Sequence, residues 1–75
     1  MAPPRKNAAL YDALRDMLEA DGSTMGEFVE ILDPDGLRST KTVERSIYRW
    51  FNWLRTEGVE VGAFRKDGTV VYKVS

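Results

Sequence analysis

Side chains that hydrogen-bond well to nucleic acid recur between residues 41 and 56 on one side of an expected helix. At 100° per residue, with Ile47 set to zero, these polar positions lie between about 100° and 200°; they are Lys41, Arg45, Tyr48, Arg49, Asn52 and Thr56. An arginine guanidinium can bind guanine O6 and N7 through two hydrogen bonds, and an asparagine carboxamide can bind adenine in the same way. Two or three such contacts, at about 1–3 kcal/mol each, suffice for modest base selectivity.

The opposite side of the same segment is apolar. Within about 60° of Ile47 on the same helical projection lie Val43, Trp50, Phe51 and Leu54. This stripe predicts a helix packed on a core, so Trp50 and Phe51 are interpreted as core residues rather than as platforms for base stacking.

The ends and the flank of this helix are also marked in the sequence. Ser39 or Thr40 can cap it, and it should run to about residue 57 and close at Gly58. Trp53 falls at roughly 240°, beside the apolar stripe. It can lean against the hairpin expected after this helix or form part of a dimer interface, since aromatic side chains are enriched at interface centres.

Charge is distributed unevenly along the chain, although the net charge is only −1. Residues 7–36 carry eight acidic side chains against one arginine, whereas residues 37–56 carry five basic side chains against one glutamate. Such segregation favours a positive face that meets a negative partner; the alternative is a solvated cationic helix face balanced by the acidic helices beside it. The acidic segment is interpreted as a solvated outer face that points away from that partner, with docking of a basic protein as an alternative.

Composition excludes several kinds of chemistry. The sequence contains no cysteine and no histidine, which removes disulfides, thiolate nucleophiles, the usual structural zinc sites and the commonest general base. Carboxylates at helical spacing, Asp12 with Asp16 and Glu27 with Glu30, have no recognisable pocket, so no enzyme, metal site or cofactor is expected. No apolar run approaches about 18 residues and no apolar stretch follows the basic start, so we expect a soluble, cytoplasmic protein.

Two shorter helices are expected before the cationic segment. Residues 1–6 form a basic arm, expected to be flexible, and Asn7 can cap a helix with an apolar stripe of Leu10, Leu14, Met17 and Leu18. Gly22 suits the left-handed position after that helix. Thr24 and Glu27 have the spacing of a capping box for a second helix, which buries Met25, Phe28, Val29 and Leu32 and ends at the DPDG sequence, residues 33–36.

The last part of the chain predicts a β-hairpin. Two alternating segments flank Asp67-Gly68, the signal of a two-residue type I′ turn. This turn sets residue 66 opposite 69, and therefore 63 opposite 72 and 61 opposite 74. The face expected to cover the helices then carries Val61, Ala63, Val70, Tyr72 and Val74, while Phe64 and Val71 pair on the other face.

Three helices followed by a hairpin, together with the stretch SIYRWFNWLRTEGVEV, resemble winged helix-turn-helix regulators of the deoxyribose-repressor type. Those proteins end their recognition helix with a pattern like [ST]-[IV]-x-R-x-[LF]-x-x-L-x-x-x-G-[VIL], matched here by Ser46, Ile47, Arg49, Phe51, Leu54, Gly58 and Val59. The resemblance covers residues 8–75. It implies an α+β winged-helix domain over residues 7–75, in which a two-stranded antiparallel wing follows the third helix.

In that fold the exposed side of the third helix lies in the DNA major groove. The side chains placed to read bases are then Thr42, Arg45, Tyr48, Arg49 and Asn52, with the Tyr48 hydroxyl bonding either a phosphate or only water. Phosphate contacts position without specifying, and they are expected from Arg38, Ser39, Thr40 and Lys41, from Arg65 and Lys66 at the tip of the wing, and from Arg5 and Lys6 in the arm.

The resulting functional prediction is a small protein that binds double-stranded DNA, as a transcriptional regulator or an architectural factor, nucleoid-associated if bacterial. A module of this size buries only about 600–1,000 Å² on DNA, which favours tandem or homodimeric binding. Small repressors and excision factors of phages or mobile elements would be compatible with so small a binding module. The alternative is a protein-interaction winged helix of a larger complex, which docks through Trp53, Phe64 and the acidic face.

Overall fold

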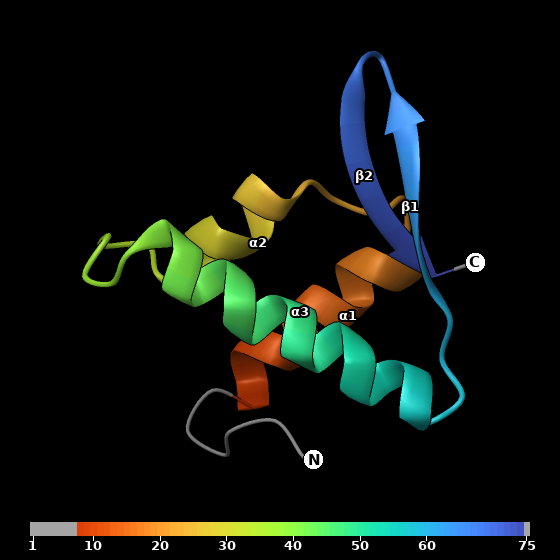
Figure 1. Cartoon of the computed structure of the whole chain (residues 1–75), viewed down its shortest axis with the longest axis horizontal. Coiled ribbons are helices and arrows are strands. Elements are labelled where there is room, and N and C mark those ends of the chain that lie inside the picture. The colour runs from red at the N-terminus through yellow and green to blue at the C-terminus, as the bar shows by residue number, and fades with distance from the viewer. Residues whose placement is uncertain (1–7, 75) are drawn as a thin grey trace.

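The structure is a computed structural model that describes residues 8–74. It contains α1 (Ala8–Glu19), α2 (Met25–Leu32), α3 (Thr40–Thr56), β1 (Val61–Lys66) and β2 (Thr69–Val74), in that order (Figure 1). The predicted α+β class, with three helices followed by a two-stranded antiparallel hairpin, is confirmed. The arm of residues 1–6 and the predicted cap at Asn7 lie outside the described residues.

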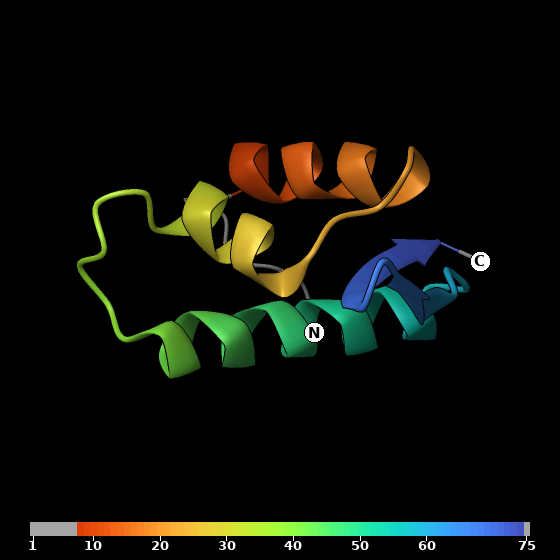
Figure 2. The ribbon, with the colours of Figure 1, turned by 90° about the horizontal axis from the view of Figure 1, so that it is seen from above.

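The helices form two sides of the molecule. Figure 2 shows α1 along one side and α3 along the other, with α2 and the base of the hairpin between them. The hairpin tip projects beyond the helices in Figure 1. This arrangement leaves one long side of α3 directed outward, away from α1.

Local signals place the starts of α2 and α3. The Thr24 side chain accepts a hydrogen bond from the Glu27 backbone N–H at 3.2 Å, and the Glu27 carboxylate accepts one from the Thr24 N–H at 2.9 Å. The capping box is therefore confirmed. For α3 the sequence left two cap residues open, and the structure selects Ser39, whose Oγ accepts from the Thr42 N–H at 3.2 Å.

The core lies where the three helices and the base of β1 meet. Its buried hydrophobic residues are Tyr11, Leu14, Leu18, Phe28, Leu32, Val43, Ile47, Trp50, Phe51, Leu54 and Val61. The predicted apolar stripe of α3 is confirmed in full, and Trp50 and Phe51 are core residues. The ring of Phe28 meets the ring of Phe51 edge to face, with centroids 6.0 Å apart, an arrangement that aromatic pairs favour.

The predicted stripe of α1 was wrong at its first position. Leu10 is 36% exposed, and Tyr11 is buried instead, with its ring centroid 5.2 Å from that of Trp50. Met17 is only half-buried. The large ring of Tyr11 packs against Trp50 on α3 and replaces Leu10 at the first buried position, while Leu14 and Leu18 stay buried as predicted; an aromatic ring buries more apolar surface than a leucine.

The hairpin has the predicted register, with Ala63 opposite Tyr72 and Val61 opposite Val74. Its turn has positive φ at both central residues, 53° at Asp67 and 80° at Gly68, as a type I′ turn requires. The predicted burial was wrong at Ala63 and at Val70, because both residues are exposed. Only the base of the hairpin rests on the helices, so these two positions have nothing to cover.

A third extended segment, which the sequence analysis missed, fixes the hairpin to the helices. Ser23 pairs with Tyr72 through two backbone hydrogen bonds, from Ser23 N to Tyr72 O at 3.0 Å and from Tyr72 N to Ser23 O at 2.8 Å. Gly22 precedes this bridge with φ of +82°, and a Cβ there would lie 2.6 Å from the Tyr72 carbonyl oxygen. Gly22 therefore permits the close approach of β2 as well as closing α1.

Candidate nucleic-acid interface

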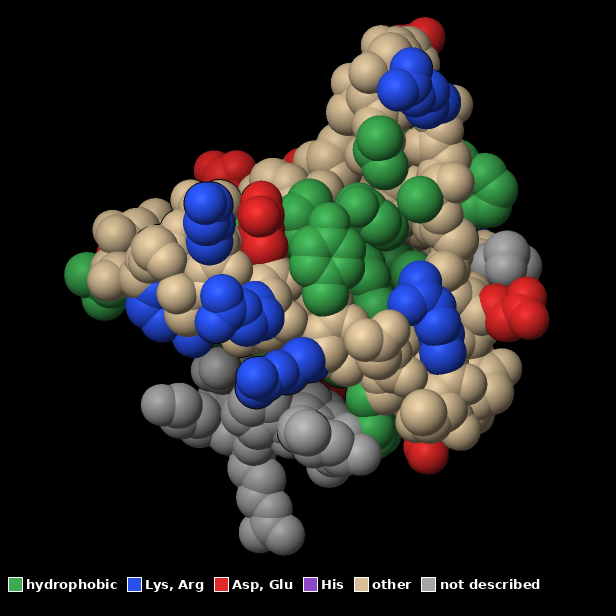
Figure 3. All heavy atoms as spheres, viewed as in Figure 1, with side chains coloured by type: hydrophobic (Ala, Val, Ile, Leu, Met, Phe, Trp, Pro, Cys, Tyr) green, Lys and Arg blue, Asp and Glu red, His purple; other side chains and the backbone are tan. Residues whose placement is uncertain are grey.

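The outward side of α3 carries the predicted cationic face. Lys41, Arg45 and Arg49 are exposed, and within residues 8–74 their side chains form no hydrogen bond and no ion pair. Figure 3 shows Lys and Arg side chains gathered over the N-terminal half of α3, on the face that Figure 1 presents to the viewer. The donors of both guanidinium groups are therefore free to meet an external acceptor.

The N-terminus of α3 uses its hydroxyl groups differently. Ser39 Oγ and Thr42 Oγ1 share a hydrogen bond of 2.8 Å, while Ser39 Oγ also accepts from the Thr42 N–H. Of the three predicted hydroxyl contacts, those of Ser39 and Thr42 are thus engaged in hydrogen bonds at the start of the helix. Thr40 is exposed beside them.

The loop before α3 is held by one carboxylate. Asp33 accepts hydrogen bonds from the backbone N–H groups of Leu37 and Arg38, each at 3.0 Å.

Burial raises the pKa of the Tyr11 hydroxyl, and the positive charge of Arg38 partly opposes this rise. Arg38 therefore acts electrostatically on α1 while its side chain remains exposed at the edge of the cationic face.

Tyr48 joins α3 to the hairpin. Its side chain is 46% exposed, as the helical period predicted, but its hydroxyl shares a hydrogen bond of 3.1 Å with the Tyr72 hydroxyl. The rings of the two tyrosines meet edge to face at 6.2 Å, and Tyr48 also meets Phe51 at 6.1 Å. The hydrogen bond that the Tyr72 hydroxyl shares with Tyr48 is the main cause that raises the pKa of Tyr72 to about 12, and burial is the second. The partner expected from the sequence for the Tyr48 hydroxyl was a phosphate or only water, so this contact with Tyr72 was not predicted.

Asn52 is exposed on the same side, but one of its polar atoms is engaged. Its Oδ1 accepts a hydrogen bond from Arg55 Nη1 at 3.0 Å, and Arg55 Nη2 donates to the backbone oxygen of Val61 at 2.9 Å. The Asn52 NH₂ group remains for an external acceptor. Arg55, which was not among the predicted site residues, ties the end of α3 to the first residue of β1.

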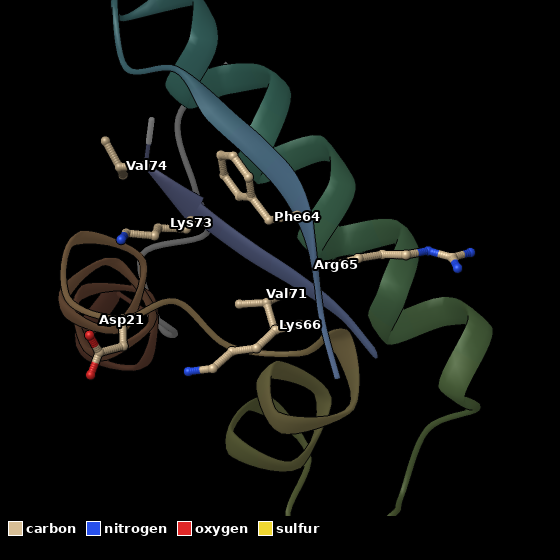
Figure 4. A pocket seen from close by; sticks show the side chains of 7 residues that line it. All are labelled: Asp21, Phe64, Arg65, Lys66, Val71, Lys73 and Val74. Atoms are coloured by element: carbon tan, nitrogen blue, oxygen red, sulfur yellow. The ribbon is translucent and has the colours of Figure 1, made fainter. Parts of the chain in front are cut away.

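The two cations of the wing tip point to different sides. In Figure 4, Arg65 extends toward the side of α3, whereas Lys66 extends toward the side where Asp21 follows α1. This follows from the alternation of side chains along a strand. Arg65 therefore extends toward the side of α3 and Lys66 toward the other face of the hairpin, although both residues line the pocket beside Phe64.

An apolar strip lies between the α3 cations and the wing tip. Figure 3 shows hydrophobic side chains, tyrosines included, from the middle of α3 up along the hairpin. Val70 is 41% exposed, and Ala63 is exposed beside it. The strip is exposed because Ala63 and Val70, which were expected to cover the helices, instead face outward above Tyr48 and Tyr72.

The two predicted interface aromatics lie in different surroundings. Trp53 is half-buried and packs against the core, whereas Phe64 is 48% exposed. Phe64 lines a pocket of about 510 Å³ between the hairpin and the turn after α1 (Figure 4). This pocket opens on the face turned away from the α3 cations, so it forms a second surface.

The exposed acidic side chains of α1 lie on the other side of the molecule from α3, although α3 itself carries the half-buried Glu44 and Figure 3 shows an acidic side chain among the α3 cations. Asp12 and Asp16 are exposed on α1, which Figure 2 places across the molecule from α3. Of the other predicted carboxylate pair, Glu27 is engaged in the capping box. An ion pair joins Arg15 to Glu19 at 3.0 Å on the surface, where such pairs contribute little to stability. Among residues 8–74, no helix is long and apolar enough to cross a membrane.

No protein-family model matches this sequence, and searches of curated proteins and of solved structures find no match.

Proposed function

We propose that this chain binds double-stranded DNA, with α3 in the major groove and the wing along the backbone, as a transcriptional regulator or an architectural factor. The observation that carries the proposal is the outward side of α3, where Lys41, Arg45 and Arg49 are exposed and have no ion pair within residues 8–74. The exposed carboxylates of α1 lie across the molecule, so the charge distribution favours one orientation toward a polyanion.

The spacing of the two arginines fits a base-reading role. Arg45 and Arg49 are four residues apart on α3, a helix of 17 residues, which corresponds to about 6 Å along the helix axis. Two base-pair steps of B-DNA span about 7 Å, from a rise of about 3.4 Å per step. Two bidentate guanidinium contacts would therefore read bases about two steps apart.

The remaining groups position the protein and hold its two contact elements together. Lys41 and Arg38 at the start of α3 would contact phosphates, with Arg65 doing so from the wing. The hydrogen bond between Tyr48 and Tyr72 and the one from Arg55 to Val61 hold the wing at a set distance from α3. The phenol of Tyr48 would face the groove through its ring edge, since its hydroxyl is engaged.

A titration of random-sequence duplex at two salt concentrations tests the proposal. We expect affinity to fall as salt rises, with a log–log slope of about −0.9 for each neutralised phosphate. The double variant Arg45→Ala/Arg49→Ala should lose most of the binding, and the control Arg15→Ala, on α1, should bind like the wild type. Equal binding by the double variant and the control would contradict the role given to α3.

One observation favours a second function, a protein-interaction module. Phe64 is 48% exposed beside a pocket on the face opposite the α3 cations. If this module acts without DNA, affinity for duplex should be weak and insensitive to Arg45 and Arg49, and a partner complex should depend on Phe64 instead.

A further inference from the structure

A pocket lies on the face of the hairpin turned away from α3. Its volume is about 510 Å³, within the range of about 300–1,000 Å³ that is typical of occupied protein pockets. Phe64, Val71 and Val74 supply its apolar surface, and Figure 4 shows Lys66 and Lys73 directed toward the side where Asp21 lies. Neither lysine forms an ion pair within residues 8–74. A matching occupant would offer an apolar side chain beside an acidic group.

The same chain carries an apolar side chain close to an acidic one in the loop between α2 and α3. Leu37 is 83% exposed, the most exposed large hydrophobic side chain in the described part of the chain. The loop is nevertheless held in one shape, because the Asp33 carboxylate binds the N–H groups of residues 37 and 38 and the Asp33 carbonyl accepts from the Gly36 N–H at 3.1 Å. Asp35 is exposed two residues before Leu37. The loop therefore presents a leucine and a carboxylate together at little further cost in conformational entropy.

The loop and the pocket cannot meet within one molecule. Figure 1 places the α2–α3 loop at one end of the long axis and the hairpin toward the other, and the molecule extends 29 Å along that axis. We propose that the pocket receives the α2–α3 loop of a second copy, with Leu37 against Phe64 and Val71 and with Asp35 near Lys66 and Lys73. This is a head-to-tail contact, which leaves one loop and one pocket free and therefore extends to further copies.

The contact is weak in free solution. One leucine, one carboxylate and their surroundings make an interface at the small end of the range for transient association. Copies that lie side by side on one duplex have a much higher effective concentration, so the same contact produces cooperative binding there. This last step, unlike the contact itself, rests on the proposed DNA-binding function.

Two variants that each remove one half of the contact test the proposal without DNA. Leu37→Ser removes the projecting side chain, and Phe64→Glu places a negative charge in the pocket; both residues are exposed, and circular dichroism checks that the fold is retained. At about 1 mM protein, where weak contacts are populated, sedimentation velocity should show wild-type chains of increasing length. Each variant alone should associate at least about tenfold more weakly.

The mixture of the two variants is the decisive sample. Leu37→Ser retains a working pocket and Phe64→Glu retains a working loop, so the mixture should form a 1:1 dimer and nothing larger. Val70→Ser, on the other face of the hairpin, is the control and should associate like the wild type. A wild type that stays monomeric, or a mixture that stays monomeric, overturns the proposal, as does a variant that associates normally.

A further experiment with DNA distinguishes this contact from the proposed DNA-binding function. On a duplex long enough for several copies, Leu37→Ser should lose the cooperative rise in binding while affinity for a single-site duplex stays within about twofold of the wild type. Self-association without any DNA affinity would refute the proposed function and leave the head-to-tail contact standing. Salt-dependent DNA binding by a strictly monomeric protein would support the proposed function and refute the head-to-tail contact.

Discussion

Replacement of Gly22 by alanine should detach the base of the wing from the helices. A Cβ at this position lies 2.6 Å from the Tyr72 carbonyl oxygen, 2.8 Å from Val71 Cγ1 and 2.9 Å from Lys73 Cβ, so β2 must move. The positive φ of 82° costs about 1–2 kcal/mol for a residue with a Cβ. Loss of the two Ser23–Tyr72 hydrogen bonds adds about 0.5–1.5 kcal/mol for each.

Gly22→Ala should therefore lower the free energy of unfolding by about 2–5 kcal/mol. At about 0.05–0.15 kcal/mol per residue, a domain of this length has a free energy of unfolding of only about 4–11 kcal/mol, so the change should be large and easily measured by urea denaturation. Gly58→Ala is the matched control, since Gly58 has φ of +89° and no atom within 4 Å of a built Cβ. Gly58→Ala should lower the free energy of unfolding only by the cost of the positive φ, about 1–2 kcal/mol. Equal losses for the two variants would refute the role given to the contact with β2.

Two further predictions concern hydrogen bonds. Because the pKa of Tyr72 is raised to about 12, the folded state favours the neutral phenol; the stability from this group is complete below about pH 10 and is lost as the pH rises toward the folded value. Tyr72→Phe should lower the free energy of unfolding by about 0.5–1.5 kcal/mol at neutral pH and flatten its alkaline decline, and an unchanged decline would exclude this hydrogen bond as its cause. Ser39→Ala should cost about 0.5–2 kcal/mol through loss of the α3 cap, while Thr40→Ala should stay within about 0.5 kcal/mol of the wild type; thermal unfolding distinguishes them, and the opposite order would place the cap at Thr40.

Features encoded by neighbouring residues could be predicted from the sequence. The capping box of Thr24 and Glu27, the turn at Asp67-Gly68 and the register of the hairpin each depend on residues within a few positions of one another. The apolar stripe of α3 was also predictable, because five large side chains fall on one side of a long helix. Such local patterns determine geometry with little help from the rest of the chain.

Features that depend on distant segments were missed. The burial of Tyr11 in place of Leu10 depends on the position of Trp50, and the exposure of Ala63 and Val70 depends on how far the hairpin projects past the helices. The Ser23–Tyr72 bridge and the Tyr48–Tyr72 hydrogen bond each join residues more than twenty positions apart. The predicted register did place Tyr72 on the face toward the helices, and this was the available signal for a partner of Tyr48.

Amide chemical-shift mapping during titration with a duplex tests most directly whether the outward side of α3 contacts DNA. We expect the largest shifts at residues 41–52 of α3 and at the hairpin tip near Arg65, with α1 amides around Asp12 and Asp16 unchanged. The opposite pattern, with shifts centred on α1 or on the pocket at Phe64 and none along α3, would contradict this expectation.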